Sequence, residues 1–425
     1  MNIDITRYFG AICILHGSSR VNEVNGGYPM QYKNKLHELD TAANKLLEKR
    51  ELLRHIYIFG AGQIGAQIMR TLYTYNILEG FIDNDKQKQQ REYKGFKVYS
   101  LEEYMQIKNG IIVIAIGEKT APDIMQQLSD SQLVEEKDFY SYTLFLNKIF
   151  PIISLYFYNK SFVSLAQISL TERCTLKCKK CAHGCHAVDN STAKDLTLEQ
   201  VKKSADSFYS KVDFIQEFVL IGGEPLLYKD LSNVIEYIGK RYKHQIGIFS
   251  ITTNGTIVPR QEIIEICKEY NIFFRISNYS SAIPNIKNIY MKLTDLLEKQ
   301  GINYYIAHEE GQWMDYGFDY VNRNASEYEL IQVFDTCKTP CREVRENKFY
   351  YCVMARSVSE NMGFNVGKND YLDLDSLHGE QGKKELLEFN LGYSDKGYLD
   401  MCNYCHGAES VNYPIPVAEQ EEKHD

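Results

Sequence analysis

The chain of 425 residues has little of what a membrane, secreted or nucleic-acid-binding protein needs. No apolar run approaches the roughly 20 residues of a membrane helix, and the longest candidate, Ile149 to Tyr158, is interrupted by Pro151 and Ser154. The first residues contain one basic side chain, Arg7, and an apolar patch too short for a signal peptide. The net charge of −8 argues against a basic surface for nucleic acid. We therefore expect a cytoplasmic protein that binds neither membrane nor nucleic acid.

Cysteine is the residue type that stands out. Eleven cysteines occur, several in short spacings, and without a signal peptide such spacings indicate metal ligation rather than disulfides. Cys174, Cys178 and Cys181 form a C-x3-C-x2-C stretch. Three thiolates on one loop can hold three irons of a four-iron, four-sulfur cluster, and the fourth iron then stays open, as in catalytic metal sites.

A second motif, Gly222-Gly223-Glu224-Pro225, follows about forty residues later. The diglycine lets the backbone approach a ligand, so the Glu224 carboxylate can meet a small cation such as an ammonium group. Each motif directly follows an apolar stretch, Leu165 to Leu170 and Phe214 to Ile221. Strands that end in ligand-binding loops are typical of a parallel α/β barrel, whose site lies at the carboxyl ends of the strands.

A zinc knuckle is the alternative interpretation of the cysteine loop. His183, Cys185 and His186 follow it at once and can complete a tetrahedral site. The two flanking strands disfavour this alternative. His183 and His186 are then loop residues without an assigned role, and Cys185 is an extra thiol near the site.

The cysteine loop and the Gly-Gly-Glu-Pro stretch together resemble the radical S-adenosylmethionine (SAM) enzymes. The resemblance implies a [4Fe–4S] cluster whose open iron binds the amine and carboxylate of SAM, with Gly222, Gly223, Glu224 and Pro225 at the amino group. It implies that the cluster, reduced by a donor such as flavodoxin or ferredoxin, cleaves SAM to a 5′-deoxyadenosyl radical. Further polar residues match those that contact SAM in the family, namely Thr253, Asn254, Ser277 and Asn278.

Alternation of strands and helices predicts an α/β fold with a partial (β/α)6 barrel over residues 160–310. His308, Glu309 and Glu310 follow the fifth strand and can contact substrate or act as a base. The expected strands are 165–170, 214–221, 246–252, 272–276 and 302–306, and the expected helices lie near 197–209, 229–242, 260–270 and 286–299. Thr197 and Gln200 predict a capping box on the first of these helices.

Residues 1–50 comprise an N-terminal segment and an amphipathic helix, which begins near Leu36. Residues 51–150 predict a Rossmann-like domain. Gly60-x-Gly62-x-x-Gly65 follows a strand and opens a helix, and Asp83 ends the next strand. Such glycines admit a phosphate to the helix N-terminus, and the acid binds ribose hydroxyls.

The ligand of this N-terminal domain remains open at the sequence level. Phe81-Ile82-Asp83-Asn84-Asp85 and Gly95-Phe96-Lys97-Val98 resemble the N-terminal domain of sugar acetyltransferases, which implies a nucleotide-sugar rather than NAD. A structural Rossmann module that has lost its ligand is the alternative.

A second set of cysteines follows in residues 311–410, before a charged tail at 411–425 whose last residues, from Glu419, we expect to be disordered. The layout resembles the twitch domain, a shortened SPASM domain that holds an auxiliary [4Fe–4S] cluster. Asn347 stands where the family has a glycine, and asparagine also tolerates a left-handed turn. A structural zinc ribbon is the alternative. The favoured ligands are Cys341, Cys352, Cys402 and Cys405, with Cys337 competing for the first position.

These features predict a radical SAM enzyme with two [4Fe–4S] clusters. Its expected substrate is a small polar metabolite, a nucleotide-linked or amino sugar, oxidised at a hydroxyl-bearing carbon. Redox-neutral epimerisation or dehydration by the same radical is an alternative. Radical modification of a ribosomally made peptide and a non-catalytic NAD or metal sensor are further alternatives. The nucleotide-type N-terminal module disfavours the peptide, and the Gly-Gly-Glu-Pro stretch disfavours the sensor.

Overall fold

The computed structural model divides the chain into two compact units, one over Leu39–Ser164 and the other from Leu165 on. Its described residues start at 38, so most of the predicted N-terminal segment lies outside them, as do His308, Glu309 and Glu310. The described residues are 38–421 without 118, 308–312, 318–320, 338, 340, 365–366, 394–396 and 408–412.

The first unit is built on a five-stranded sheet in the order β3-β2-β1-β4-β5, and every pair of neighbours is parallel. The central strand, β1, is fully buried, which suits its run of apolar and aromatic residues. The strands are β1 (Ile56–Phe59), β2 (Leu78–Ile82), β3 (Val98–Tyr99), β4 (Ile111–Ile114) and β5 (Phe139–Ser141). The helices are α1 (Glu38–Leu47), α2 (Gln63–Thr74), α3 (Lys86–Gln89), α4 (Leu101–Ile107), α5 (Ala121–Asp130), α6 (Tyr142–Leu144) and α7 (Phe150–Tyr158).

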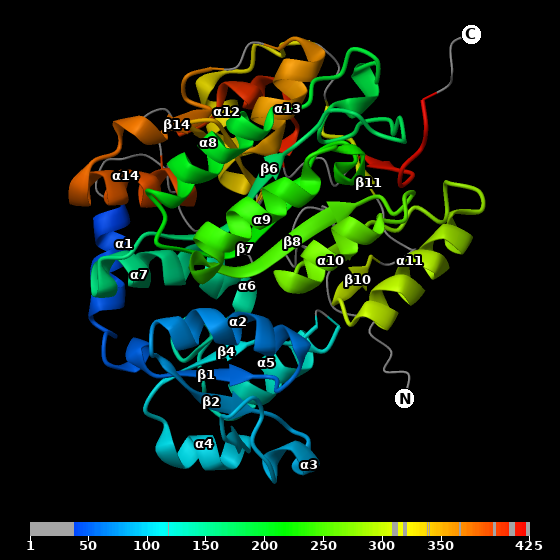
Figure 1. The fold of residues 1–425 in the computed structure, drawn as a ribbon. Helices are drawn as coiled ribbons and strands as arrows, with labels where there is room; N and C mark the ends of the chain where they lie inside the picture. Colours follow the sequence, from blue (N-terminus) through cyan, green and yellow to red (C-terminus); the bar gives the residue numbers. More distant parts are fainter. Residues whose placement is uncertain are drawn as a thin grey trace. The chain divides into compact units, whose positions relative to one another are not determined.

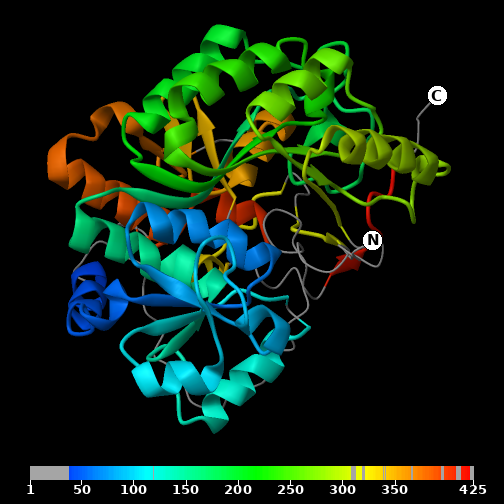
Figure 2. The same cartoon turned by 60° about the horizontal axis from the view of Figure 1, so that its bottom comes forward.

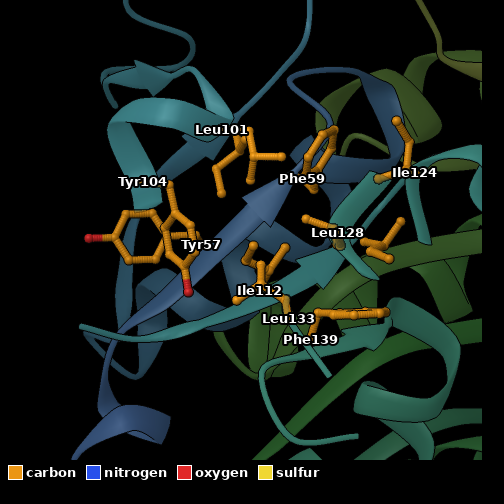
Figure 3. Packing of buried hydrophobic residues seen from close by; sticks show 11 residues of the cluster. Tyr57, Phe59, Leu101, Tyr104, Ile112, Ile124, Leu128, Leu133 and Phe139 are labelled. Atoms are coloured by element: carbon orange, nitrogen blue, oxygen red, sulfur yellow. The ribbon is translucent and has the colours of Figure 1, made fainter. Parts of the chain in front are cut away.

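Helices α4 and α5 cover one face of this sheet. Their apolar side chains, including Leu101, Tyr104 and Leu128, pack with Tyr57, Ile112 and other strand residues in one buried cluster (Figure 3). A capping box at Ser100 and Glu103 begins α4. The strand order and the helix placement are those of a doubly wound α/β unit.

The second unit contains an eight-stranded sheet in the order β10-β9-β8-β7-β6-β12-β13-β14 (Figure 1). Strands β7 to β10 pair in parallel, and β12 joins the other side of β6, also in parallel. These strands are β6 (Phe162–Ser169), β7 (Phe214–Ile221), β8 (Ile246–Thr253), β9 (Phe273–Ile276), β10 (Tyr304–Ile306), β12 (Arg342–Arg345), β13 (Lys348–Tyr350) and β14 (Tyr371–Asp373). A separate ribbon pairs β11 (Trp313–Met314) with β15 (Pro414–Ile415).

Helices α8 to α11 follow successive strands, and Figures 1 and 2 show them along the same side of the sheet. The capping box at Thr197 and Gln200 is confirmed. These helices are α8 (Leu198–Tyr209), α9 (Leu231–Tyr242), α10 (Gln261–Glu269) and α11 (Ile286–Gln300). The predicted α/β fold class and the parallel strand–helix alternation are confirmed.

The region of the second cysteine set also has regular structure. It contains α12 (Glu327–Thr336), α13 (Val353–Met362), α14 (Gly379–Leu391) and the 3-10 turn η7 (Asp400–Tyr404). Two expectations for the C-terminal part of the chain are wrong. Glu346, with φ +54°, is the left-handed residue of the β12–β13 turn, not Asn347, and Glu419 to Glu421 are paired with another segment rather than disordered.

Among the helices of the described residues, none combines the length and the apolar character that a membrane span requires.

Candidate active site

One pocket gathers most of the residues that the sequence singles out. The loops after β6, β7, β8 and β9 line it, as expected for the carboxyl ends of parallel strands. The predicted residues that line it are Cys174, Cys178, Cys181, Gly222, Gly223, Thr253, Asn254 and Ser277. The predicted residues outside the lining are Glu224, Pro225 and Asn278.

The loop that carries the first three cysteines is held by charged and amide side chains. Arg173 makes a two-point ion pair with Asp195, with Nε–Oδ1 and Nη2–Oδ2 distances of 3.0 and 2.6 Å. The Asn190 side chain accepts from the Cys174 N–H and donates to the Cys174 carbonyl at 3.1 and 2.8 Å. These contacts fix the backbone of Cys174, which is the preorganisation that a metal site needs.

Gly223 lies against this loop so closely that no side chain fits. A Cβ at Gly223 would come within 2.2 Å of the Arg173 carbonyl oxygen. The diglycine thus brings the strand β7 loop onto the cysteine loop, which is a packing reason for glycine beside the predicted ligand approach.

Glu224 lies next to the pocket but is not part of its lining. Its side chain is fully buried, and its carboxylate accepts hydrogen bonds from Thr253 Oγ1 and the Asn254 N–H, both at 2.8 Å. It also accepts from the Leu226 N–H at 3.0 Å. Burial raises the pKa of Glu224 to about 7. Glu224 therefore positions two pocket residues instead of lining the pocket itself.

Aromatic side chains form much of the remaining wall, and sequence reasoning missed them. Tyr279 and Trp313 contact each other edge to face, with ring centroids 5.7 Å apart, and Tyr305 and Tyr316 also line the pocket. Trp313 is the single tryptophan of the chain. Residue 313 lies beside the cysteine loop only in the folded chain, so the sequence alone does not reveal that it lines the pocket.

Cationic side chains lie in the same wall. Arg275 pairs with Glu217 at 3.2 Å, and Lys180 pairs with Asp315 at 3.1 Å. Both line the pocket, as does His183. The pocket thus combines apolar rings with polar groups, which is the usual composition of a small-molecule site.

The chemistry of the three thiols fits an iron–sulfur cluster. Burial, together with the charge of Cys181, raises the pKa of Cys174 and of Cys178 to about 12. Hydrogen bonding from Cys185 lowers the pKa of Cys181. Thiols with raised pKa values become thiolates when a cation binds them, so a metal would supply the missing stabilisation.

No three His, Cys, Asp or Glu side chains converge on a single metal ion among the described residues. A four-iron cluster does not require such convergence, because each thiolate binds a different iron. The residues that would hold such a cluster are Cys174, Cys178 and Cys181.

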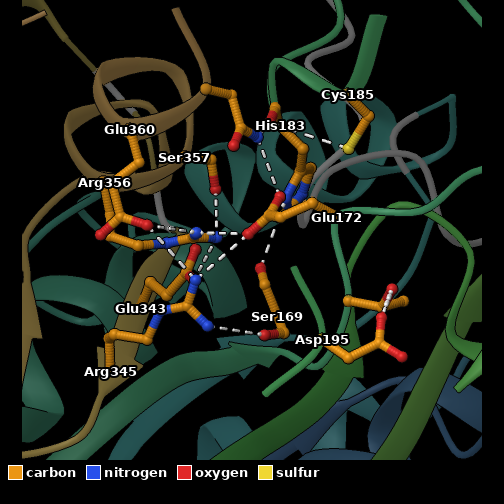
Figure 4. A network of polar contacts seen from close by, with 12 residues as sticks. Ser169, Glu172, His183, Cys185, Asp195, Glu343, Arg345, Arg356, Ser357 and Glu360 are labelled. Carbon is orange, nitrogen blue, oxygen red and sulfur yellow. Dashed lines mark hydrogen bonds and ion pairs between the residues drawn. The ribbon is translucent and has the colours of Figure 1, made fainter. Parts of the chain in front are cut away.

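A buried charge network lies beside the cysteine loop (Figure 4). Arg356 of α13 is fully buried and pairs with Glu172 and Glu343, each at 2.6 Å. Burial alone would lower the pKa of Arg356, but the carboxylates of Glu343, Glu172 and Glu360 raise it. Because Glu172 precedes Cys174 by two residues and Arg356 follows Cys352 by four, the network ties the two cysteine regions together.

The second cysteine set gathers thiols from three helix ends. Cys337 ends α12, Cys352 precedes α13, and Cys402 and Cys405 lie in and after η7. Burial, together with the charge of Cys337, raises the pKa of Cys405 to about 12. Cys337 acts in the same direction on Cys352 and Cys402.

Cys341, the favoured first ligand, is buried, and its carbonyl accepts from the Val353 N–H at 3.1 Å, next to Cys352. The competing residue Cys337 also lies near these thiols, since its charge raises the pKa of Cys352, Cys402 and Cys405. Both residues therefore remain candidates for the first ligand. The Arg323 guanidinium donates to the carbonyls of Cys402 and Cys405 and holds their turn.

The glycine loop of the first unit is also assembled as a turn. A Cβ at Gly65 would come within 2.2 Å of the Gly60 carbonyl oxygen, whereas the space beyond Gly62 is open. Gly62 begins α2 without a side-chain cap. Asp83 accepts from the Ala61 N–H at 2.9 Å and pairs with Lys88 at 2.9 Å, so its carboxylate is already partly engaged.

Comparison with known proteins assigns the central region. Residues 168–278 match the profile described as "Radical SAM superfamily", and residues 52–138 match "C2185-like, N-terminal". A probable GTP 3′,8-cyclase of Methanococcus aeolicus is 34% identical over 103 residues, which are 24% of this chain and 33% of the relative. Molybdenum cofactor biosynthesis protein 1 of Dictyostelium discoideum is 36% identical over 96 residues, 22% of this chain and 14% of the relative. The matches thus span a third or less of these two relatives.

Two solved structures show weaker similarity. BtrN in complex with AdoMet and 2-DOIA is 14% identical, with a TM-score of 0.39, over 62% of this chain and 98% of that one. SuiB of Streptococcus suis bound to the precursor peptide SuiA is 14% identical, with a TM-score of 0.28, over 72% of this chain and 88% of that one. These values are too low to transfer a substrate. The profile match covers the cysteine loop and the strand ends that line the pocket, and the chain therefore contains a radical SAM domain.

Proposed function

We propose that this protein is a radical SAM enzyme that oxidises a small polar substrate, a nucleotide-linked or amino sugar, at a hydroxyl-bearing carbon. The observation that carries the proposal is that Cys174, Cys178 and Cys181 line one pocket together with the glycine, threonine and asparagine residues of two further strand ends.

When bound at Cys174, Cys178 and Cys181, the cluster supplies the electron that cleaves SAM to methionine and a 5′-deoxyadenosyl radical. The residues of the chain position the reactants. The Thr253 hydroxyl and the Asn254 backbone are held by Glu224, and Asn254 also donates to Thr175 Oγ1 at 2.9 Å. These strand ends would hold SAM beside the thiols, while the rings of Tyr279 and Trp313 exclude water from the radical.

The reaction balances as a two-electron oxidation. The radical removes a hydrogen atom from the carbon and leaves as 5′-deoxyadenosine. Loss of the hydroxyl proton and of one further electron then gives a ketone or aldehyde. An auxiliary cluster at Cys337, Cys352, Cys402 and Cys405 would supply the acceptor for that electron, which supports oxidation over redox-neutral epimerisation or dehydration.

The substrate class rests on two features. The pocket combines aromatic rings, which suit the C–H face of a sugar ring, with the charged groups of Lys180 and Arg275. In the first unit, the uncapped start of α2 and the open space at Gly62 suit a phosphate. A purine nucleotide is the second candidate, because relatives of the matched region are named GTP 3′,8-cyclases.

The test is product analysis with anaerobically reconstituted protein and a reductant. Formation of 5′-deoxyadenosine, coupled to a substrate lighter by two hydrogens, is the expected result with one member of a panel of nucleotide-sugars and amino sugars. GTP and peptides belong in the same panel. Turnover of a peptide alone would replace the sugar proposal with the peptide-modifying one.

Asp83 tests the nucleotide part separately. Asp83→Ala removes an acceptor for ribose hydroxyls and the partner of Ala61 and Lys88, so nucleotide affinity should fall about ten- to a hundredfold. SAM cleavage in the second unit should not change. Calorimetry that detects no nucleotide binding to wild type at millimolar concentration would contradict the assignment.

A further inference from the structure

Residues 413–421, here called the C-terminal strap, lie along the cysteine loop. The first part of the strap pairs with β11 through Met314 and Pro414. The second part pairs with the loop itself, because the Lys179 N–H donates to the Glu419 carbonyl and the Glu421 N–H donates to the Lys177 carbonyl, both at 2.7 Å. The strap is therefore joined to the loop by backbone hydrogen bonds on both sides of Cys178.

Apolar burial fixes the strap in the same place. Ala418 is fully buried and Val417 is 8% exposed, and both pack in one cluster with Cys174, Leu176 and Cys178. Trp313 and Tyr279 pack against this cluster. The strap thus covers the apolar side of the cysteine loop.

Gln420 carries a specific contact. Its side-chain oxygen accepts from the Lys177 N–H at 2.8 Å, and its Nε2 donates to the Ala418 carbonyl at 2.6 Å. Rotating the amide by 180° would face two oxygens toward each other and leave the Lys177 N–H without its acceptor. The orientation is therefore fixed, and it directs the second N–H of Nε2 toward Cys178 Sγ, 3.2 Å away.

We propose that Gln420 is a positioning residue of the iron–sulfur cluster, which donates a hydrogen bond to the Cys178 thiolate and makes the bound cluster easier to reduce. The proposal rests on a cluster at Cys174, Cys178 and Cys181. Reduction adds negative charge that spreads onto the thiolates, so an N–H directed at one of them stabilises the reduced form more than the oxidised form. Hydrogen bonds to cluster sulfurs are among the features that set the reduction potential.

The experiment is a redox titration of the full-length, reconstituted protein followed by electron paramagnetic resonance. The signal that changes on addition of SAM reports the cluster at Cys178 and separates it from any second cluster. Gln420→Leu removes all three amide contacts, whereas Gln420→Glu keeps an oxygen for Lys177 and removes the donor to Ala418 and Cys178. Lys179→Met is the matched control, because it breaks the exposed Lys179–Glu419 ion pair of the same strap and leaves Gln420 in place.

Both Gln420 variants should lower the midpoint potential with iron content unchanged. Gln420→Glu should lower it further, since a carboxylate then faces the thiolate. An unchanged potential in Gln420→Glu, or an equal shift in Lys179→Met, would overturn the proposal. Wild-type protein that binds no iron would overturn the proposed function instead, and this inference with it.

Discussion

The two cysteine regions differ in how the chain brings their thiols together. Cys174, Cys178 and Cys181 belong to one short loop that opens onto a pocket. Cys337, Cys352, Cys402 and Cys405 come from the ends of α12, α13 and η7, and three of them are buried. The first region has the open face that a catalytic cluster needs, and the second is enclosed, which suits electron transfer.

The difference also explains what each sequence pattern can predict. A loop motif fixes its ligands by covalent spacing, so the residues that lie together in the fold are those that lie together in the sequence. A distributed set depends on helix packing, and Cys337 and Cys341, four residues apart, cannot be ranked by spacing alone.

The largest expected effect separates Cys337 from Cys341. Cys337→Ala should remove the irons of the second cluster, about four of a total of about eight, and leave SAM cleavage intact. Cys341→Ala is the matched control and should keep both clusters. Iron analysis of the reconstituted variants decides the point. Loss of iron in Cys341→Ala but not in Cys337→Ala would show that Cys341 is the ligand.

The next effect concerns the network that joins the two regions. Arg356→Leu removes the arginine that pairs with buried Glu343 and one of the two that pair with Glu172, and should destabilise the second unit by about 3–5 kcal/mol. Thermal unfolding of the metal-free protein measures it. Lys240→Met, which breaks an exposed pair with Glu236 on α9, should lower the stability far less. Similar losses of stability in the two variants would show that the buried network stabilises the protein no more than an exposed ion pair does.

The next prediction concerns Glu224, which belongs to the first cysteine region. Glu224→Ala leaves the Thr253 hydroxyl and the Asn254 N–H without their acceptor, so SAM affinity should fall about tenfold or more. Both clusters should keep their iron, because no metal ligand changes. Equilibrium binding of SAM is the measurement, and wild-type affinity in the variant would refute a positioning role.

The smallest effects come from the residues that hold each loop. Asn190→Ala removes the side-chain pairing with the Cys174 backbone, and Arg323→Met removes the donors to Cys402 and Cys405. Each loss should cost about 1–2 kcal/mol and should lower iron retention in its own region. If either variant lost iron equally from both regions, the two sites would not be independent.

Periodicity and capping predicted much of the parallel sheet of the second unit and the helices that follow its strands. The strands Phe214–Ile221 and Ile246–Thr253 and the capped helix after Thr197 lie close to their expected positions, because local apolar patterns and local hydrogen bonds determine such elements. The contiguous cysteine loop was readable for the same reason.

Three features of the site could not be read from the sequence. Trp313 and Gln420 reach the cysteine loop only through the pairing of β11 with β15 and of the strap with the loop. Glu224 appeared to face a ligand because its neighbours are glycines, yet its carboxylate turns to Thr253 and Asn254 on the next strand. Contacts between segments that are distant in the sequence produce no periodic pattern in the sequence.

The most direct test of the account is SAM cleavage by the anaerobically reconstituted protein with a chemical reductant, measured as 5′-deoxyadenosine. Wild type should produce it, as should a variant with Cys352, Cys402 and Cys405 replaced by alanine. A variant with Cys174, Cys178 and Cys181 replaced by alanine should produce none. No cleavage by wild type, or undiminished cleavage without the first three cysteines, would contradict the assignment of the catalytic cluster.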